Sequence, residues 1–143
     1  MTTRTTNPIV QRFNEIPWHD SKLLSVYCYK ADGEDRVKLS LELLGDGGTL
    51  TSAELVFKEC GFFVADVFLA AKSMCADDIS GAECYESSDW KKTVSEPQPF
   101  DVIQGNRGLD HHLHFRISVI PPGGTINLLA KDFELLDGIH ARS

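Results

Sequence analysis

Apolar and polar residues alternate along several stretches of this chain, which is the pattern of a β-strand with one buried face. Residues 36–44 are the clearest case. Apolar side chains there occupy every second position, at Val37, Leu39, Leu41 and Leu43. Similar but less regular runs occupy residues 22–30, 49–60, 62–70, 112–120 and 125–136. A period of two, rather than 3.6, predicts strands over these ranges.

Turn-forming residues separate these runs. The pair Asp32-Gly33 follows the first run, a glycine-rich turn at 45–48 follows the second, and "PPGG" at 121–124 precedes the last. Short spacing between strands favours antiparallel pairing, and the last two runs form the clearest predicted hairpin. The pattern predicts a mainly β fold, an antiparallel sandwich or open barrel of about six strands.

Three segments lack the alternation. The first dozen residues are polar and rich in threonine, so we expect them to fray. Residues 70–82 contain alanine, lysine and methionine, which favour one short helical segment. Residues 86–110 contain two prolines and two glycines and predict a long loop, which is uncommon unless it is mobile or functional. Ser87, Ser88 and Asp89 nevertheless have the composition of a helix N-cap before Trp90.

Length and charge limit the classes of function. A chain of 143 residues fits one β-rich domain over residues 1–143, and it can bury a core without a metal or disulfide. Its formal net charge is −7, which repels phosphate backbones and argues against a nucleic-acid partner. The same charge suits a basic protein partner. The oligomeric state does not follow from these quantities.

The cysteines and the N-terminus indicate a compartment. The four cysteines lie at positions 28, 60, 75 and 84, and no pair has the C-x-x-C spacing of a zinc ribbon or a thioredoxin-type site. The N-terminus lacks the apolar run of a signal peptide, and no stretch approaches the ~18 apolar residues of a membrane span. We therefore expect a cytoplasmic protein with reduced thiols and no membrane contact. A disulfide between Cys75 and Cys84 is the one local alternative.

Three histidines within "LDHHLHFRISVI" are the most chemical-looking feature of the chain. In a strand over 112–120, His112 and His114 share a face with Arg116. The opposite face is apolar and should be core, formed by Leu113, Phe115, Ile117 and Val119. The two histidines should therefore project together, toward solvent or a groove.

An i, i+2 pair of histidines can chelate a metal, but a catalytic zinc site needs a third ligand. His19 and His140 are the histidines elsewhere, and no spacing joins them to this pair. Arg116 would also place a positive charge beside any cation. The favoured interpretation is a pair of polar-face histidines without a metal or cofactor. A metal site and an acid–base role remain the alternatives.

The segment "PWHDSK" collects Trp18, His19, Asp20 and Ser21. Adjacent residues of an extended chain point in opposite directions, so this order does not predict a catalytic triad. We expect Trp18 to bury its ring, and Asp20 or Ser21 to hydrogen-bond a turn. Trp90 either anchors a partner or packs back onto the core. No catalytic residue is predicted. The candidate binding residues are Trp18, His19, Asp20, Trp90, His112, His114 and Arg116.

Two segments, "IPWHDSKLLSVYCYK" and "HFRISVIPPGGTINLLAKDFEL", carry a resemblance. The chain resembles small bacterial β-rich domains, some of them grouped with toxin-immunity proteins, in which an aromatic-polar motif leads into a strand and a hairpin ends the chain. The resemblance implies a non-enzymatic binding protein, with an acidic surface that suits a basic toxin domain. The sequence-based hypothesis is a cytoplasmic binding protein without catalytic activity. The competing hypothesis is a β-barrel protein that binds a metal or small molecule through His19, His112 and His114.

Overall fold

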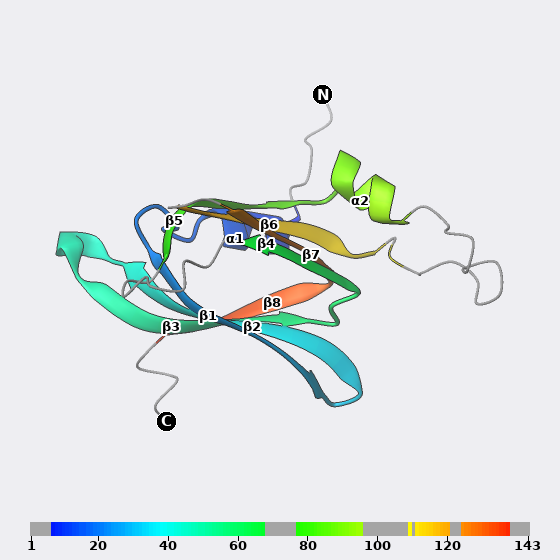
Figure 1. Cartoon of the computed structure of the whole chain (residues 1–143), viewed down its shortest axis with the longest axis horizontal. Coiled ribbons are helices and arrows are strands. Elements are labelled where there is room, and N and C mark those ends of the chain that lie inside the picture. Colours follow the sequence, from blue (N-terminus) through cyan, green and yellow to red (C-terminus); the bar gives the residue numbers. More distant parts are fainter. Residues whose placement is uncertain (1–6, 68–76, 96–108, 110, 121–123, 138–143) are drawn as a thin grey trace.

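Eight strands form one antiparallel sheet in the order β4-β7-β6-β5-β1-β2-β3-β8 (Figure 1). The computed structural model describes residues 7–67, 77–95, 109, 111–120 and 124–137. The strands are β1 (Lys22–Ala31), β2 (Glu34–Leu44), β3 (Leu50–Lys58), β4 (Phe62–Val67), β5 (Asp77–Tyr85), β6 (Leu113–Ile120), β7 (Gly124–Ala130) and β8 (Asp132–Asp137). A 3-10 turn, η1 (Asp46–Gly48), joins β2 to β3. The predicted mainly β, antiparallel class is confirmed, whereas the expected number of about six strands is wrong.

One additional strand comes from the C-terminal run, which we predicted as a single strand over 125–136. The run divides at Lys131, whose backbone N–H donates to the carbonyl of Lys58 at 3.1 Å. On one side of this point β7 pairs with β6, as the predicted hairpin requires, and on the other side β8 pairs with β3. The core-facing positions change phase here, from Ile126, Leu128 and Ala130 in β7 to Phe133 and Leu135 in β8, a change that the prediction of one strand did not take into account.

The second additional strand, β5, replaces part of the helical segment that we expected at 70–82. Residues 77–82 are extended, and residues 68–76 lie outside the described part of the chain. Ile79 and Cys84 both face the core although they are five positions apart. A β-bulge between Ile79 and Gly81 shifts the register by one residue and makes this possible. The bulge conceals the period of two, which is why the sequence did not read as a strand.

The sheet bends strongly, so that the apolar faces of its two parts meet. β1 pairs with β2 along its whole length but with β5 only at Lys22 and Leu23. The rings of Phe57 on β3 and Phe115 on β6 have centroids 4.9 Å apart, although three strands, β5, β1 and β2, lie between β6 and β3 in the sheet order. Within the described residues the sheet does not close, because β4 and β8 remain its two edges.

A short helix at the N-terminal end corrects the expectation that the first dozen residues fray. Residues 1–6 lie outside the described part, but α1 (Pro8–Asn14) is a regular helix. Asn7 caps it by accepting the backbone N–H of Ile9 at 2.8 Å, and Pro8 occupies the first turn. The helix inserts Phe13 into the core, where its ring lies 5.0 Å from that of Phe115.

The predicted core face of β6 is confirmed. Its four apolar members are all buried: Leu113, Phe115, Ile117 and Val119. Trp18 is also buried, as expected, and its indole N–H donates to the carbonyl of Phe13 at 2.9 Å. Ser21 hydrogen-bonds the turn before β1, donating to the carbonyl of Pro17 at 2.8 Å.

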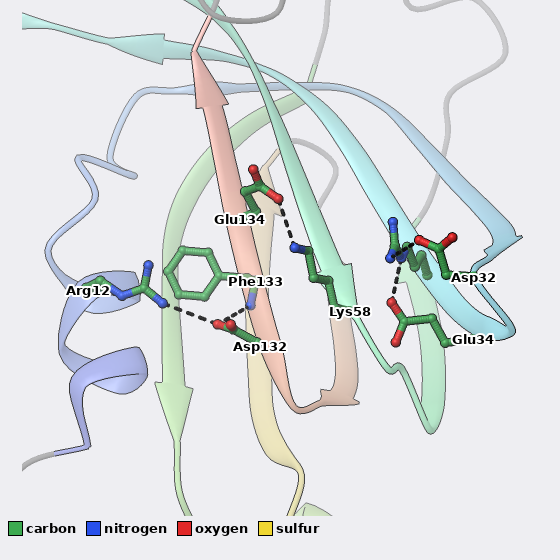
Figure 2. Close-up of polar contacts among 8 residues, drawn as sticks. Arg12, Asp32, Glu34, Lys58, Asp132, Phe133 and Glu134 are labelled. Atoms are coloured by element: carbon green, nitrogen blue, oxygen red, sulfur yellow. Dashed lines mark hydrogen bonds and ion pairs between the residues drawn. The ribbon is translucent and has the colours of Figure 1, made fainter.

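Polar contacts hold α1 against β8 on the outside of the core (Figure 2). The Arg12 guanidinium lies 3.2 Å from the Asp132 carboxylate and 4.9 Å from the centre of the Phe133 ring. Lys58 on β3 pairs with Glu134 on β8 at 3.0 Å. These groups are largely exposed, so each ion pair contributes little stability by itself. The Arg12 contacts orient the helix that carries Phe13, whereas the Lys58–Glu134 pair links β3 to β8.

Candidate functional site

A second helix, α2 (Asp89–Ser95), lies within residues 86–110, where we predicted a long loop with an N-cap-like composition before Trp90. Ser88 is its N-cap, and its hydroxyl accepts the backbone N–H of Lys91 at 3.0 Å. The Trp90 ring stacks on the His114 ring, with centroids 4.6 Å apart, and meets the Phe62 ring edge-on at 5.8 Å. The helix therefore packs on the sheet face opposite the main core. Residues 96–108 and 110 lie outside the described part.

His114 lies at the centre of this packing and is only 4% exposed. Its Nε2 lies 2.7 Å from Oδ1 of Asn127 on β7, and its Nδ1 lies 2.7 Å from the Ser88 hydroxyl. Because an amide oxygen only accepts, Nε2 carries the proton and donates to Asn127. Nδ1 then accepts the hydroxyl proton of Ser88. Both ring nitrogens are thus used within the protein, in the neutral form of the imidazole.

His112 is buried as well, with 7% of its surface exposed. It hydrogen-bonds the backbone of Glu59, while its Nδ1 is buried without a hydrogen-bond partner among the described residues. Gly61 lies directly beneath it. A Cβ atom at position 61 would lie 3.0 Å from Nε2 of His112 and 2.4 Å from a methyl group of Leu109. The absence of a side chain at Gly61 is therefore what lets Leu109 and His112 approach the sheet.

Burial lowers the pKa of both histidines below the ordinary value, because it disfavours the charged imidazolium. The positive charge of Arg116 lowers the pKa of His114 further, and that of Lys131 acts on His112 in the same direction. Hydrogen bonds to Asn127 and to the Glu59 backbone oppose these effects without reversing them. Both side chains are consequently neutral near pH 7.

The prediction that His112 and His114 project toward solvent or a groove is wrong. They do share the face of Arg116, as strand parity indicated, but α2 and Leu109 cover that face beside them while Arg116 stays exposed. In the part of the chain that the structure describes, no group of three or more histidine, cysteine or acidic side chains could hold a metal ion. With both nitrogens of His114 already hydrogen-bonded, the described residues do not fit a metal centre.

Ser88, His114 and Asn127 form a chain of hydrogen bonds in the order of a nucleophile, a base and an orienting group. The Ser88 oxygen is also the cap of α2, and the Trp90 ring covers the imidazole. Helix capping and packing account for every one of these contacts. We therefore interpret the chain as the structural attachment of α2 to the sheet.

The candidate residues near the first strand are not brought to this site. His19 and Asp20 are exposed and pair with each other at 3.0 Å. The Asp20 backbone N–H donates to the carbonyl of Ile79, which lies six positions along β5 from Tyr85, the residue opposite His114. At about 3.3 Å per residue, roughly 20 Å separates the segment of His19 and Asp20 from His114. Trp18 belongs to the main core rather than to a binding surface.

Another feature, which the sequence pattern did not reveal, is the exposed length of β1. Leu24, Val26 and Tyr27 are 50%, 38% and 58% exposed. A bulge between Leu23 and Ser25 changes the register here, and the strand continues past the end of its pairing with β5. Figure 1 shows the β1–β2 turn projecting away from the rest of the sheet. The sequence signal that could have indicated this exposure is the presence of apolar residues on both faces of residues 22–30.

Two details shape the surface around Leu24, Val26 and Tyr27, which we call the β1 surface. The Tyr27 ring stacks on Tyr29 at 5.6 Å, and the Lys38 ammonium lies over the same ring at 5.6 Å. Farther along the hairpin is a pocket of 370 Å³ between the β1–β2 turn and the start of β4. Its lining is Cys28, Tyr29, Lys30, Asp35, Arg36, Val37, Cys60, Phe62 and Phe63.

No family model matches the chain, and neither the curated proteins nor the solved structures include a significant match to it. None of the helices in the described residues has the length and apolar character needed to cross a membrane. These comparisons therefore supply no function for the chain.

Proposed function

We propose that this protein acts by binding a protein partner through the β1 surface, and that it has no catalytic activity. The observation that carries the proposal is the exposure of Leu24, Val26 and Tyr27 on one strand. Isolated exposed apolar residues are common, but three within four positions leave both faces of this length of strand uncovered among the described residues. Tyrosine in particular is favoured at the centres of protein interfaces.

The backbone of β1 supports the same proposal. Among the described residues, positions 24–31 pair only with β2, so this length of β1 is available as a strand edge. Proteins commonly bind an extended partner segment by adding it to such an edge, with backbone hydrogen bonds for affinity and side-chain pockets for specificity. The contacts of Tyr27 with Tyr29 and Lys38 hold its ring in place, which reduces the entropy lost on binding.

The proposed partner is a basic protein. A net charge of −7 accelerates association with a positively charged surface through long-range attraction. The resemblance to bacterial domains of the toxin-immunity type supports the same class of partner, and a cytoplasmic location belongs to this proposal. The alternative of a metal- or small-molecule-binding β-barrel has less support, since His19 lies roughly 20 Å from His114 and the histidine nitrogens of His114 are hydrogen-bonded within the protein.

The test requires a purified partner and two matched variants. Tagged protein is expressed in its source cells, the stoichiometric partner is identified and purified, and its Kd is measured by titration calorimetry. Val26→Asp on the β1 surface should raise the Kd at least tenfold, through a lost apolar contact and a buried charge. Val64→Asp is the control, because Val64 on β4 is 40% exposed, close to the 38% of Val26.

The control should change the Kd less than about twofold, since it lies outside the proposed surface. Equal weakening by both variants, or no weakening by Val26→Asp, would place the interface elsewhere. Failure to recover any stoichiometric partner would contradict the binding function itself.

A further inference from the structure

The attachment of α2 to the sheet depends on few contacts. The helix has seven residues and buries none of them completely. A helix this short is not stable in water by itself, so it persists only while it is docked. Apart from the edge-on contact of Trp90 with Phe62, its described contacts with the sheet are made to His114, which binds Ser88 through Nδ1 and stacks under Trp90. A change in the charge of this imidazole therefore acts directly on the docking of the helix.

Protonation would oppose the hydrogen bonds seen at both histidines. At His114 the Nδ1 atom accepts the Ser88 hydroxyl proton, and a protonated Nδ1 would become a second donor facing that hydroxyl. The Ser88 oxygen already accepts the backbone N–H of Lys91, so it would receive two donors and lose the acceptor of its own proton. At His112 a protonated Nδ1 would be a buried donor that no described group accepts.

The charges around the two rings act in the same direction. Arg116 on β6 faces His114, and Lys131 and Lys91 face His112 from the β7–β8 junction and from α2. Tyr85 and Asn127, which flank His114 on β5 and β7, carry no charge near neutral pH. Glu59 is the carboxylate that acts on His112, and Glu83 lies opposite Arg116. Two further positive charges would therefore enter a site where cations already outnumber carboxylates.

Two groups favour a charged His114: Asn127, which accepts a hydrogen bond from the imidazole, and the Trp90 ring, since an aromatic face attracts a cation. This attraction is available only while the ring remains docked and desolvated. Burial of the imidazole and the charge of Arg116 act in the opposite direction and lower the pKa of His114.

We propose that His112 and His114 form a pH-sensitive latch, in which protonation of the two histidines releases α2 from the sheet. Release would uncover Leu129, which is fully buried in the docked state, together with Phe62 and Tyr85 beside it. The latch lies on the face opposite the main core and is independent of the proposed partner binding at β1. Since the pKa of each histidine is lowered, we expect α2 to be released only below about pH 6.5.

Trp90 is the natural reporter of this step. The chain has two tryptophans, so Trp18→Phe leaves Trp90 as the sole source of indole fluorescence. We expect its emission to shift to longer wavelength as the pH falls from about 8 to about 5, with a midpoint below about 6.5. Far-UV circular dichroism, recorded on the same samples, should retain its strand signal through this transition.

Two variants in the Trp18→Phe background test whether the transition comes from His112 and His114. His114→Gln, combined with His112→Gln, keeps neutral hydrogen-bonding groups but removes the titration, and should abolish the shift. His19→Gln is the matched control, because His19 is exposed and pairs only with Asp20 among the described residues. It should leave the midpoint unchanged.

Hydrogen exchange of the wild-type chain gives an independent measurement if a variant fails to fold. After correction for the intrinsic pH dependence of exchange, the amides of residues 91–95 should lose protection at least tenfold more than those of β6 between pH 8 and about pH 5. An unchanged Trp90 emission, a transition that persists in the double glutamine variant, or loss of α2 protection only together with β6 would each overturn the proposal.

Discussion

Replacing Phe13 by alanine should be among the most damaging substitutions in this protein. The side chain is completely buried between the two parts of the bent sheet. Its ring lies 4.8 Å from that of Trp18, 5.0 Å from Phe115 and 5.3 Å from Phe133, measured between centroids. Helix α1 contributes this residue from outside the sheet, so nothing within the sheet itself can take its place.

The expected cost follows from the size of the ring and the stiffness of its surroundings. Phenylalanine-to-alanine changes in cores cost about 3–5 kcal/mol, which already includes lost transfer free energy and a cavity term. Favourable ring–ring geometry adds about 0.5–1.5 kcal/mol per pair beyond area burial, so the upper half of that range is expected. Because small domains have about 5–15 kcal/mol of total stability, this loss is large.

Equilibrium unfolding in urea measures this cost directly. The midpoint should fall while the slope with denaturant stays constant, which indicates a change in stability rather than in compactness. Gln11→Ala on the exposed side of α1 is the control. It removes only a hydrogen bond to Glu15 and should cost less than about 0.5 kcal/mol. A loss below about 1 kcal/mol for Phe13→Ala would refute the conclusion that α1 fills the core.

Three further predictions test the core, the histidines and the absence of a metal. Ile117→Ala should cost about 2–5 kcal/mol in denaturant unfolding, because Ile117 is fully buried on β6, and a change under about half a kcal/mol would assign the wrong face. Because the pKa values of His112 and His114 are lowered by folding, the unfolded chain binds more protons than the folded chain below about pH 6.5. The stability that these groups contribute is complete above that pH and decreases as the pH falls toward the folded-state pKa values. The melting temperature should therefore fall between pH 8 and about pH 5. A melting temperature that rises over this interval on acidification would contradict the assignment. Purified tag-free protein should carry no stoichiometric zinc, nickel or iron, and a chelator should not change its melting temperature; one bound metal per chain, lost when both histidines become alanine, would reverse this conclusion.

Local alternation was sufficient for the strands that keep a strict register. Residues 36–44 and 113–119 were predicted with the correct buried faces because each side chain's direction follows from its neighbours one position away. The same reasoning failed at β5, where the bulge between Ile79 and Gly81 interrupts the period. It also failed at Lys131, where the core-facing positions change phase and the strand partner changes from β6 to β3.

The candidate site shows the same division. Parity correctly placed His112 and His114 on the face of Arg116, and the composition before Trp90 correctly indicated a helix cap. Their burial depends on Leu109 and on α2, and the helix lies about twenty positions earlier in the chain. The exposure of Val26 likewise depends on where β5 stops pairing with β1. Alternation decides which side chains share a face because it acts between neighbours. Only tertiary contacts between distant segments decide which faces are covered, and so which residues remain available to a partner or a proton.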